Sequence, residues 1–86
     1  GLGDAADADL LARFRDAGDE DAFAELLRRH GPMVLGVCRR VARADAEDAF
    51  QAAFLVLALK PGRVRPPGRV GAWLHGVAHL TALKAR

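Results

Sequence analysis

The sequence predicts an all-α fold, a compact bundle of about four helices within one domain. Wherever apolar residues show a period, they recur every three or four positions, which is the spacing of one face of an α-helix. Gly18 and a proline-rich stretch after Leu59 are turn signals that separate such segments. The chain is 51% apolar and 6% aromatic, and its 86 residues allow one modest core but not two.

The first helix is expected to follow the acidic N-terminus. Its apolar positions fall three or four apart: Leu10, Leu11 and Phe14. Asp7 or Asp9 is expected at its N-cap, because a carboxylate there can accept free backbone N–H groups. Gly18 is expected to end the helix, since glycine adopts the left-handed conformation that terminates helices at little cost.

The second helix is expected to begin after Asp19, which can cap it. Its apolar stripe keeps helical spacing and consists of Phe23, Leu26, Leu27, His30, Val34, Val37, Cys38 and Val41. Gly31-Pro32 lies inside this stripe. Proline removes one backbone hydrogen bond and clashes with the preceding turn, at a cost of about 3 kcal/mol. We therefore expect a bent helix or two abutting helices, with His30 at the edge of the core.

The third helix is expected after a break at Ala44-Asp45 and to continue to about Leu59. Asp45 followed by Asp48 imitates a capping box, although that motif prefers Glu or Gln at its second position. This helix is apolar almost all the way round, which indicates either complete burial or a partner. The residues alone favour burial among the other three helices.

A basic loop and a last helix complete the predicted bundle. The loop is Lys60–Arg69, where three prolines and two glycines prevent a helix from continuing. The inner face of the last helix is predicted to consist of Val70, Trp73, Leu74, Val77, Ala78 and Thr81. Its outer face is predicted to consist of Ala72, His75, Gly76, His79, Leu83 and Arg86.

The charges divide the chain into an acidic front and a basic back, although the net charge is only +2. Acids outnumber cations up to Glu25, and no acid follows Asp48. The cations after Asp48 are Lys60, Arg63, Arg65, Arg69, Lys84 and Arg86. This asymmetry favours a polyanionic partner for the basic part over a simply solvated tail.

No pattern of residues supports catalysis, a cofactor or a metal. The chain has no serine, which excludes a Ser-His-Asp triad, and it has no phosphate-binding glycine motif. His75 and His79 have the spacing of two zinc ligands, but no further ligand is indicated. Cys38 is the only cysteine and is expected to be a small buried residue, which suits a reducing cytoplasm. No apolar run reaches the roughly 18 residues that cross a bilayer, so no membrane contact is expected.

Three segments resemble the second conserved region of bacterial RNA polymerase sigma factors, and the extracytoplasmic-function (ECF) type in particular. They are DLLARFRDAGDEDAFAELLRRHGPMV, DAEDAFQAAFLVL and VGAWLHGVAHLTALKAR, which together extend from about Asp7 to Arg86. The most specific part is Asp48, Gln51 and Phe54 in the middle segment, followed by Trp73-Leu74 in the last.

The resemblance implies that the third helix docks on the clamp coiled coil of the largest polymerase subunit. The residues that would face the polymerase are Asp48, Gln51, Ala52, Leu55 and Leu59. The residues that would face the core of the domain are Phe50, Ala53, Phe54 and Leu57. This docking would explain why the helix is apolar on two faces.

The resemblance also implies that the loop and the last helix bind promoter DNA. The loop would capture a base flipped from the −10 element, and the helix would follow the non-template strand. The DNA-binding residues would be Lys60, Arg63, Arg65, Arg69, His75, His79, Leu80 and Arg86. The acidic first helix would keep its side of the domain away from DNA.

The sequence departs from the family pattern at three positions. Gly76 stands where a basic residue is common, Leu80 where a polar or basic one is common, and Ala52 where an acid is common. Residues 1–86 would form region 2 alone, without the helix-turn-helix domain that reads the −35 element. The alternative function is a degenerate sigma-like module that binds polymerase or an anti-sigma protein without melting DNA. Gly76 and Leu80 favour this alternative, and the acid-free basic part argues against it.

Overall fold

The computed structural model describes residues 1–86 and contains four α-helices and no strand, which confirms the predicted all-α bundle. The helices are α1 (Asp7–Ala17), α2 (Glu20–Ala42), α3 (Ala46–Leu59) and α4 (Val70–Ala85). Short 3-10 turns cover Leu2–Asp4, Arg43–Asp45, Pro61–Arg63 and Pro67–Arg69. None of the helices combines the length and the hydropathy needed to cross a membrane.

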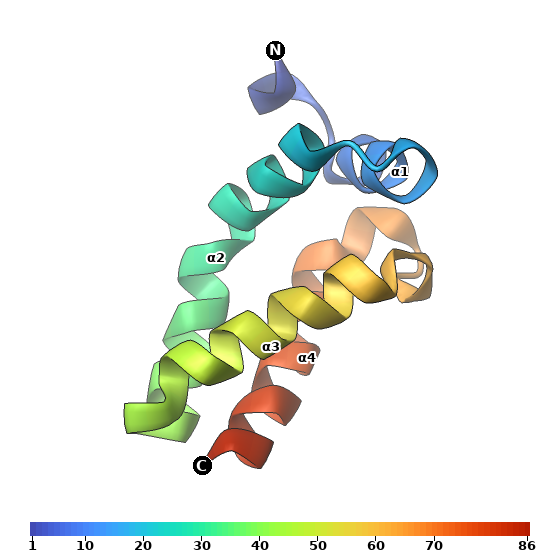
Figure 1. The fold of residues 1–86 in the computed structure, drawn as a ribbon. Coiled ribbons are helices and arrows are strands. Elements are labelled where there is room, and N and C mark those ends of the chain that lie inside the picture. The colour runs from blue at the N-terminus through green and yellow to red at the C-terminus, as the bar shows by residue number, and fades with distance from the viewer.

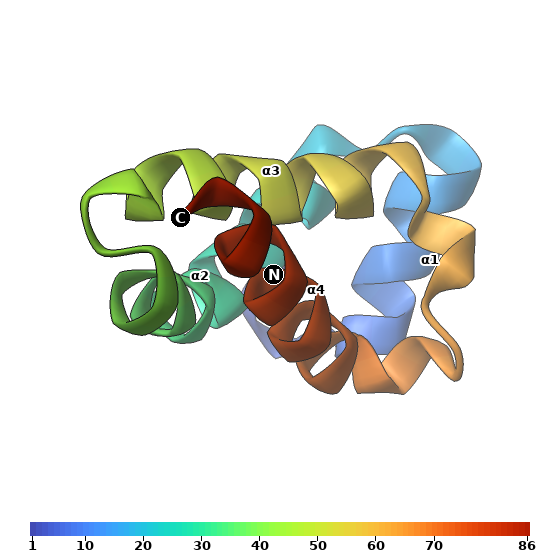
Figure 2. The same cartoon turned by 90° about the horizontal axis from the view of Figure 1, so that it is seen from below.

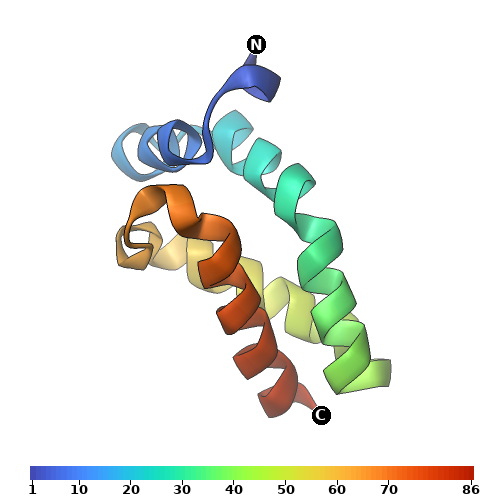
Figure 3. The same ribbon diagram turned by 180° about the vertical axis from the view of Figure 1, so that it is seen from behind.

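Helices α2, α3 and α4 pack against one another in pairs and form the body of the domain. Figure 1 shows α3 crossing in front of α4, with the two termini at opposite ends of the molecule. Helix α1 lies at the N-terminal end, where it packs on α2 and on both turns of the Lys60–Arg69 loop. Figure 3 shows the same neighbourhood of α1 and the loop from behind. The loop is therefore held between the first helix and the body of the bundle.

The core is a single cluster of 18 buried apolar residues, to which all four helices contribute. It includes no polar or charged residue. The buried residues are Leu10, Leu11, Ala22, Leu26, Val34, Val37, Cys38, Ala42, Ala46, Ala49, Ala53, Phe54, Leu57, Val64, Val70, Leu74, Ala78 and Ala82. Five of these residues are alanines of α3 and α4: Ala46, Ala49, Ala53, Ala78 and Ala82. Cys38 is buried as predicted, and burial raises the pKa of its thiol.

Two of the predicted helix ends are confirmed, and two are wrong. Gly18 ends α1 with a left-handed φ of 64°, and the Asp19 carboxylate accepts the Ala22 N–H at 3.2 Å. Neither Asp7 nor Asp9 caps α1, because the cap position is Ala6. Nor do Asp45 and Asp48 form a capping box: Asp45 makes no capping bond, because the chain already turns as a 3-10 helix before α3 begins.

Helix α2 extends from Glu20 to Ala42 with Pro32 inside it. Figure 3 shows that it bends along its length, as the Gly31-Pro32 pair predicts. Gly31 is buried and Pro32 is exposed, so the proline ring lies on the solvent side. The apolar stripe stays in phase across the pair, and one long helix therefore supports both α3 and α4.

Candidate functional site

One face of α3 is open to solvent, contrary to the expectation from the residues alone that the other helices surround it. Leu55 is 57% exposed and Leu59 is 70% exposed. We define the α3 face as these leucines together with exposed Asp48 and Gln51 and half-buried Ala52. Figure 2 shows α3 along the upper edge of the bundle, with α4 below it. The structure thus brings together every residue predicted for polymerase binding on one uncovered surface.

Shallow hollows lie on both sides of the α3 face. The hollow between α2 and α3, about 330 Å³ in volume, is lined by Phe23, Leu27, Phe50, Gln51, Phe54, Leu55 and Ala58. The hollow between α3 and α4, about 300 Å³ in volume, is lined by Asp48, Ala49, Ala52, Thr81, Lys84 and Ala85. The first is almost entirely apolar, and its phenylalanine rings pack against one another: the ring centroids of Phe50 and Phe54 are 5.1 Å apart with the rings tilted by 49°. A partner helix on the α3 face would therefore find apolar recesses along both of its edges.

The loop presents unpaired positive charge next to the α3 face. Lys60, Arg63, Arg65 and Arg69 are all exposed, and no carboxylate lies close enough to form an ion pair with them. Val64 is only 2% exposed and anchors the middle of the loop in the core. Since Leu59 and Lys60 are neighbours in sequence, the apolar and the basic surfaces are continuous.

A hollow of about 540 Å³ lies between the loop and α1. It is lined by Arg15, Gly62, Val64, Arg65, Pro66 and Pro67. The Arg65 Nε–H donates to the Gly62 carbonyl at 3.3 Å, and Arg15 is paired with Asp16 at 2.8 Å. Sequence reasoning missed Arg15, because only the tertiary contact of α1 with the loop brings it here. No periodicity or motif indicates that contact.

The outer face of α4 carries the remaining predicted residues. His75, His79, Leu80 and Arg86 are exposed, and Leu80 is 58% exposed. A side chain added at Gly76 would meet nothing within 4 Å. No group of three or more His, Cys, Asp or Glu residues is arranged to hold a metal ion.

The side-chain ion pairs all lie within the first 30 residues. Glu25 accepts hydrogen bonds from Arg28 and Arg29 at 2.7 Å, and Arg29 also bonds Asp7 at 3.1 Å. The two guanidinium groups lower the pKa of Glu25 to about 2. Part of the acidic front is therefore neutralised internally, whereas the basic back is left without counter-charges.

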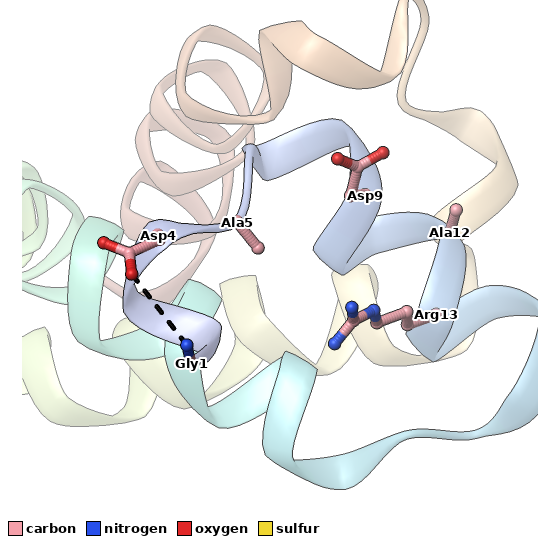
Figure 4. A pocket seen from close by; sticks show the side chains of 6 residues that line it. All are labelled: Gly1, Asp4, Ala5, Asp9, Ala12 and Arg13. Carbon is pink, nitrogen blue, oxygen red and sulfur yellow. Dashed lines mark ion pairs between the residues drawn. The ribbon is translucent and has the colours of Figure 1, made fainter.

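A further hollow, at the N-terminal end, contains none of the predicted site residues. Figure 4 shows its lining by Gly1, Asp4, Ala5, Asp9, Ala12 and Arg13. The Gly1 ammonium lies 3.8 Å from Asp4, and Asp9 and Arg13 add one negative and one positive side chain to the lining. This mixed polar surface gathers no reactive or metal-binding set.

Comparison with known proteins adds a family assignment to this geometry. The family model described as Sigma-70 region 2 matches residues 26–86. "RNA polymerase sigma factor CarQ" of Myxococcus xanthus is 44% identical over 77 residues, which cover 87% of this chain and 44% of that protein. "ECF RNA polymerase sigma factor SigM" of Mycobacterium tuberculosis strain H37Rv is 40% identical over 73 residues, which cover 83% of this chain and 37% of that protein. The chain thus spans less than half the length of these relatives, and no solved structure matches it significantly.

Proposed function

The chain belongs to the sigma-70 region 2 family, in its ECF branch, and from this premise we propose that residues 1–86 bind the polymerase clamp and the −10 promoter element. The observation that supports both activities most directly is the continuity of two surfaces. Exposed leucines on α3 pass at Leu59-Lys60 into a loop of unpaired cations.

The α3 face would bind the clamp coiled coil. Leu55 and Leu59 are large exposed apolar side chains, and burying them against a partner gains roughly 25 cal/mol for each Å² removed from water. Asp48 and Gln51 lie one turn apart on the same face and supply directed polar contacts, which fix the register of the partner helix. The hollows along both edges would receive side chains of the coiled coil.

The loop and the outer face of α4 would bind the non-template strand. The unpaired Arg63, Arg65 and Arg69 can each neutralise a phosphate and release its counterions. The hollow between the loop and α1 is large enough for an unstacked base, whose extrusion costs a few kcal/mol. The prolines stiffen the loop, so less entropy is lost when it binds. His75, His79 and Arg86 would extend the contact along α4, with Leu80 as an apolar contact.

A second function is favoured by two residues on α4. Gly76 offers no side chain and Leu80 no polar group on the surface that would contact the strand. The second function is that of a sigma-like module that binds polymerase or an anti-sigma protein through the α3 face alone and does not melt DNA. Such a module would need neither a side chain at position 76 nor a polar group at position 80. The unpaired cations of the loop favour DNA binding over this alternative.

One pair of binding measurements distinguishes the two functions. The 86-residue chain is titrated against an isolated clamp coiled coil and, separately, against a fluorescent single-stranded oligonucleotide carrying a −10 sequence. The proposed function expects both to bind, and the alternative expects the coiled coil only. Failure of the chain to bind the coiled coil would contradict both.

A further inference from the structure

We infer that Asp7, His30 and Gly71 form a chain of contacts through which the N-terminal segment positions the DNA-binding loop and the first turn of α4. This inference rests on the proposed function, because it treats the loop as the DNA contact. It assigns a role to the acidic front beyond keeping one side of the domain away from DNA. The three residues come from α1, α2 and α4, so the chain of contacts crosses the whole N-terminal end of the domain.

The first contact joins α1 to α2. The His30 Nε2 lies 2.9 Å from the Asp7 Oδ2, and the two side chains are 17% and 23% exposed. An ionised carboxylate can only accept, so the Nε2–H donates and the ring orientation is fixed. Asp7 can form this contact because it lies in the first turn of α1 rather than capping it.

Asp7 is itself held from its other oxygen. The Arg29 Nη1 donates to Asp7 Oδ1 at 3.1 Å. The Arg29 Nη2 donates to the carbonyls of Leu2 and Gly3 at 3.0 and 3.1 Å, and Glu25 accepts from its Nε. Both carboxylate oxygens of Asp7 are therefore engaged by neighbouring residues of α2. The His30 ring is consequently held against a fixed support and has little freedom to shift.

The second contact joins His30 to the start of α4. A Cβ built at Gly71 would lie 3.1 Å from His30 Cε1 and 3.2 Å from Nδ1. These separations are closer than ordinary van der Waals contact, so the ring lies directly against the Gly71 backbone. Elsewhere in the helices, a Cβ at Gly31 or Gly36 would meet its nearest neighbour only at 3.8 or 3.7 Å. Gly71 is thus the position where the absence of a side chain permits close packing.

Gly71 is the second residue after the loop, so its position sets where the loop ends. Arg69, Val70 and Gly71 are consecutive, and Val70 is fully buried. Helix α1, held by Asp7, also packs on both turns of the loop, and its Arg15 lines the hollow beside Arg65. The N-terminal segment therefore constrains the loop at its end through His30 and along its length through α1.

The test is a pair of substitutions that should compensate each other. Gly71→Ala places a methyl group against the His30 ring and should displace the start of α4, lowering affinity for the single-stranded −10 oligonucleotide about tenfold. His30→Ala removes the ring that supports α4 and should also lower this affinity. The double variant should recover most of both losses, because the new methyl group at position 71 fills the space that the ring occupied and restores packing between α2 and α4. Gly36→Ala is the matched control, a glycine in a helix with ordinary contacts, and should leave DNA affinity unchanged.

Two further readouts separate positioning from general destabilisation. Binding of the clamp coiled coil should stay within about twofold of wild type in every variant, because none of these contacts involves a residue of the α3 face. Amide hydrogen exchange across residues 60–69, measured without DNA, should rise in Gly71→Ala and fall again in the double variant. Unchanged loop exchange in folded Gly71→Ala, or equal losses of both binding activities, would overturn the inference. A third outcome is that wild-type protein binds no DNA while loop exchange still rises in Gly71→Ala and falls again in the double variant. That outcome would contradict the proposed function and still support the positioning of the loop.

Discussion

The hydroxyl of Thr81 on α4 lies 3.1 Å from the backbone carbonyl of Ala49 on α3 and donates a hydrogen bond to it. It shares this proton with the carbonyl of Ala78 in its own helix, also 3.1 Å away. This contact joins the helix proposed to bind polymerase to the helix proposed to bind DNA. It is also the only side-chain hydrogen bond between α3 and α4.

Replacing Thr81 with valine should destabilise the domain by about 1 kcal/mol, because the Ala49 carbonyl loses its side-chain donor while shape is preserved. Urea unfolding followed by circular dichroism measures the change. Thr81→Ser keeps the hydroxyl, so the domain should lose less stability than in Thr81→Val. Equal stability of Thr81→Val and wild type would show that the bond contributes nothing net.

The double substitution Gln51→Ala with Leu55→Asp should abolish binding to the clamp coiled coil. It removes one directed polar contact and places a charge in the apolar part of the α3 face. Both positions are exposed, so the helical circular dichroism should not change. Glu47→Ala, an exposed neighbour outside the face, is the control. Retained binding by the double variant would exclude this surface as the docking site.

Changing Arg63, Arg65 and Arg69 together to alanine should weaken binding of single-stranded −10 DNA and reduce its salt dependence. Three lost phosphate contacts should lower the slope of log affinity against log salt by about 2, at roughly 0.7 for each contact. Anisotropy titrations across a range of salt concentrations give this slope. Arg39 and Arg40, exposed cations in the last turn of α2, can be changed to alanine as controls. A slope that matches wild type would place the DNA contact elsewhere.

Stability should fall in acid partly through Glu25. Its pKa is lowered in the folded chain from 4.5 to about 2 by Arg28 and Arg29, so its contribution is fully present above 4.5 and is lost as the pH falls towards 2. Urea unfolding across this pH range should show the loss. Glu25→Gln does not titrate, so its stability should decline less steeply over the same interval. Parallel declines in the two proteins would mean that other carboxylates account for the acid sensitivity.

Much of the fold could be predicted from the sequence, because helical period and turn residues are local signals. The stripe on α2, the end of α1 at Gly18, the loop from Lys60 to Arg69 and the inner face of α4 all follow from spacing of a few residues. The open face of α3 was not predicted from the residues alone, since an apolar helix can be buried or partnered with the same pattern. The family resemblance was needed to choose between these two outcomes.

The features that escaped prediction depend on residues far apart in the chain. Asp7 looks like a cap in the sequence, but in the structure it pairs with Arg29 and His30, and Ala6 takes the cap position. Arg15 joins the hollow beside the loop only because α1 folds against it. No local pattern encodes such contacts, and only the packed structure shows them.

The attachment of the loop through Val64 has a consequence for how binding preferences can diverge. Between Lys60 and Arg69 only this side chain is fully inserted into the core, and the charged residues on either side are exposed. Selection can therefore replace those neighbours one at a time with little effect on folding. The same arrangement makes the segment suitable for grafting: a loop of equal length that keeps the central valine and its prolines could replace it on this scaffold without disturbing the core.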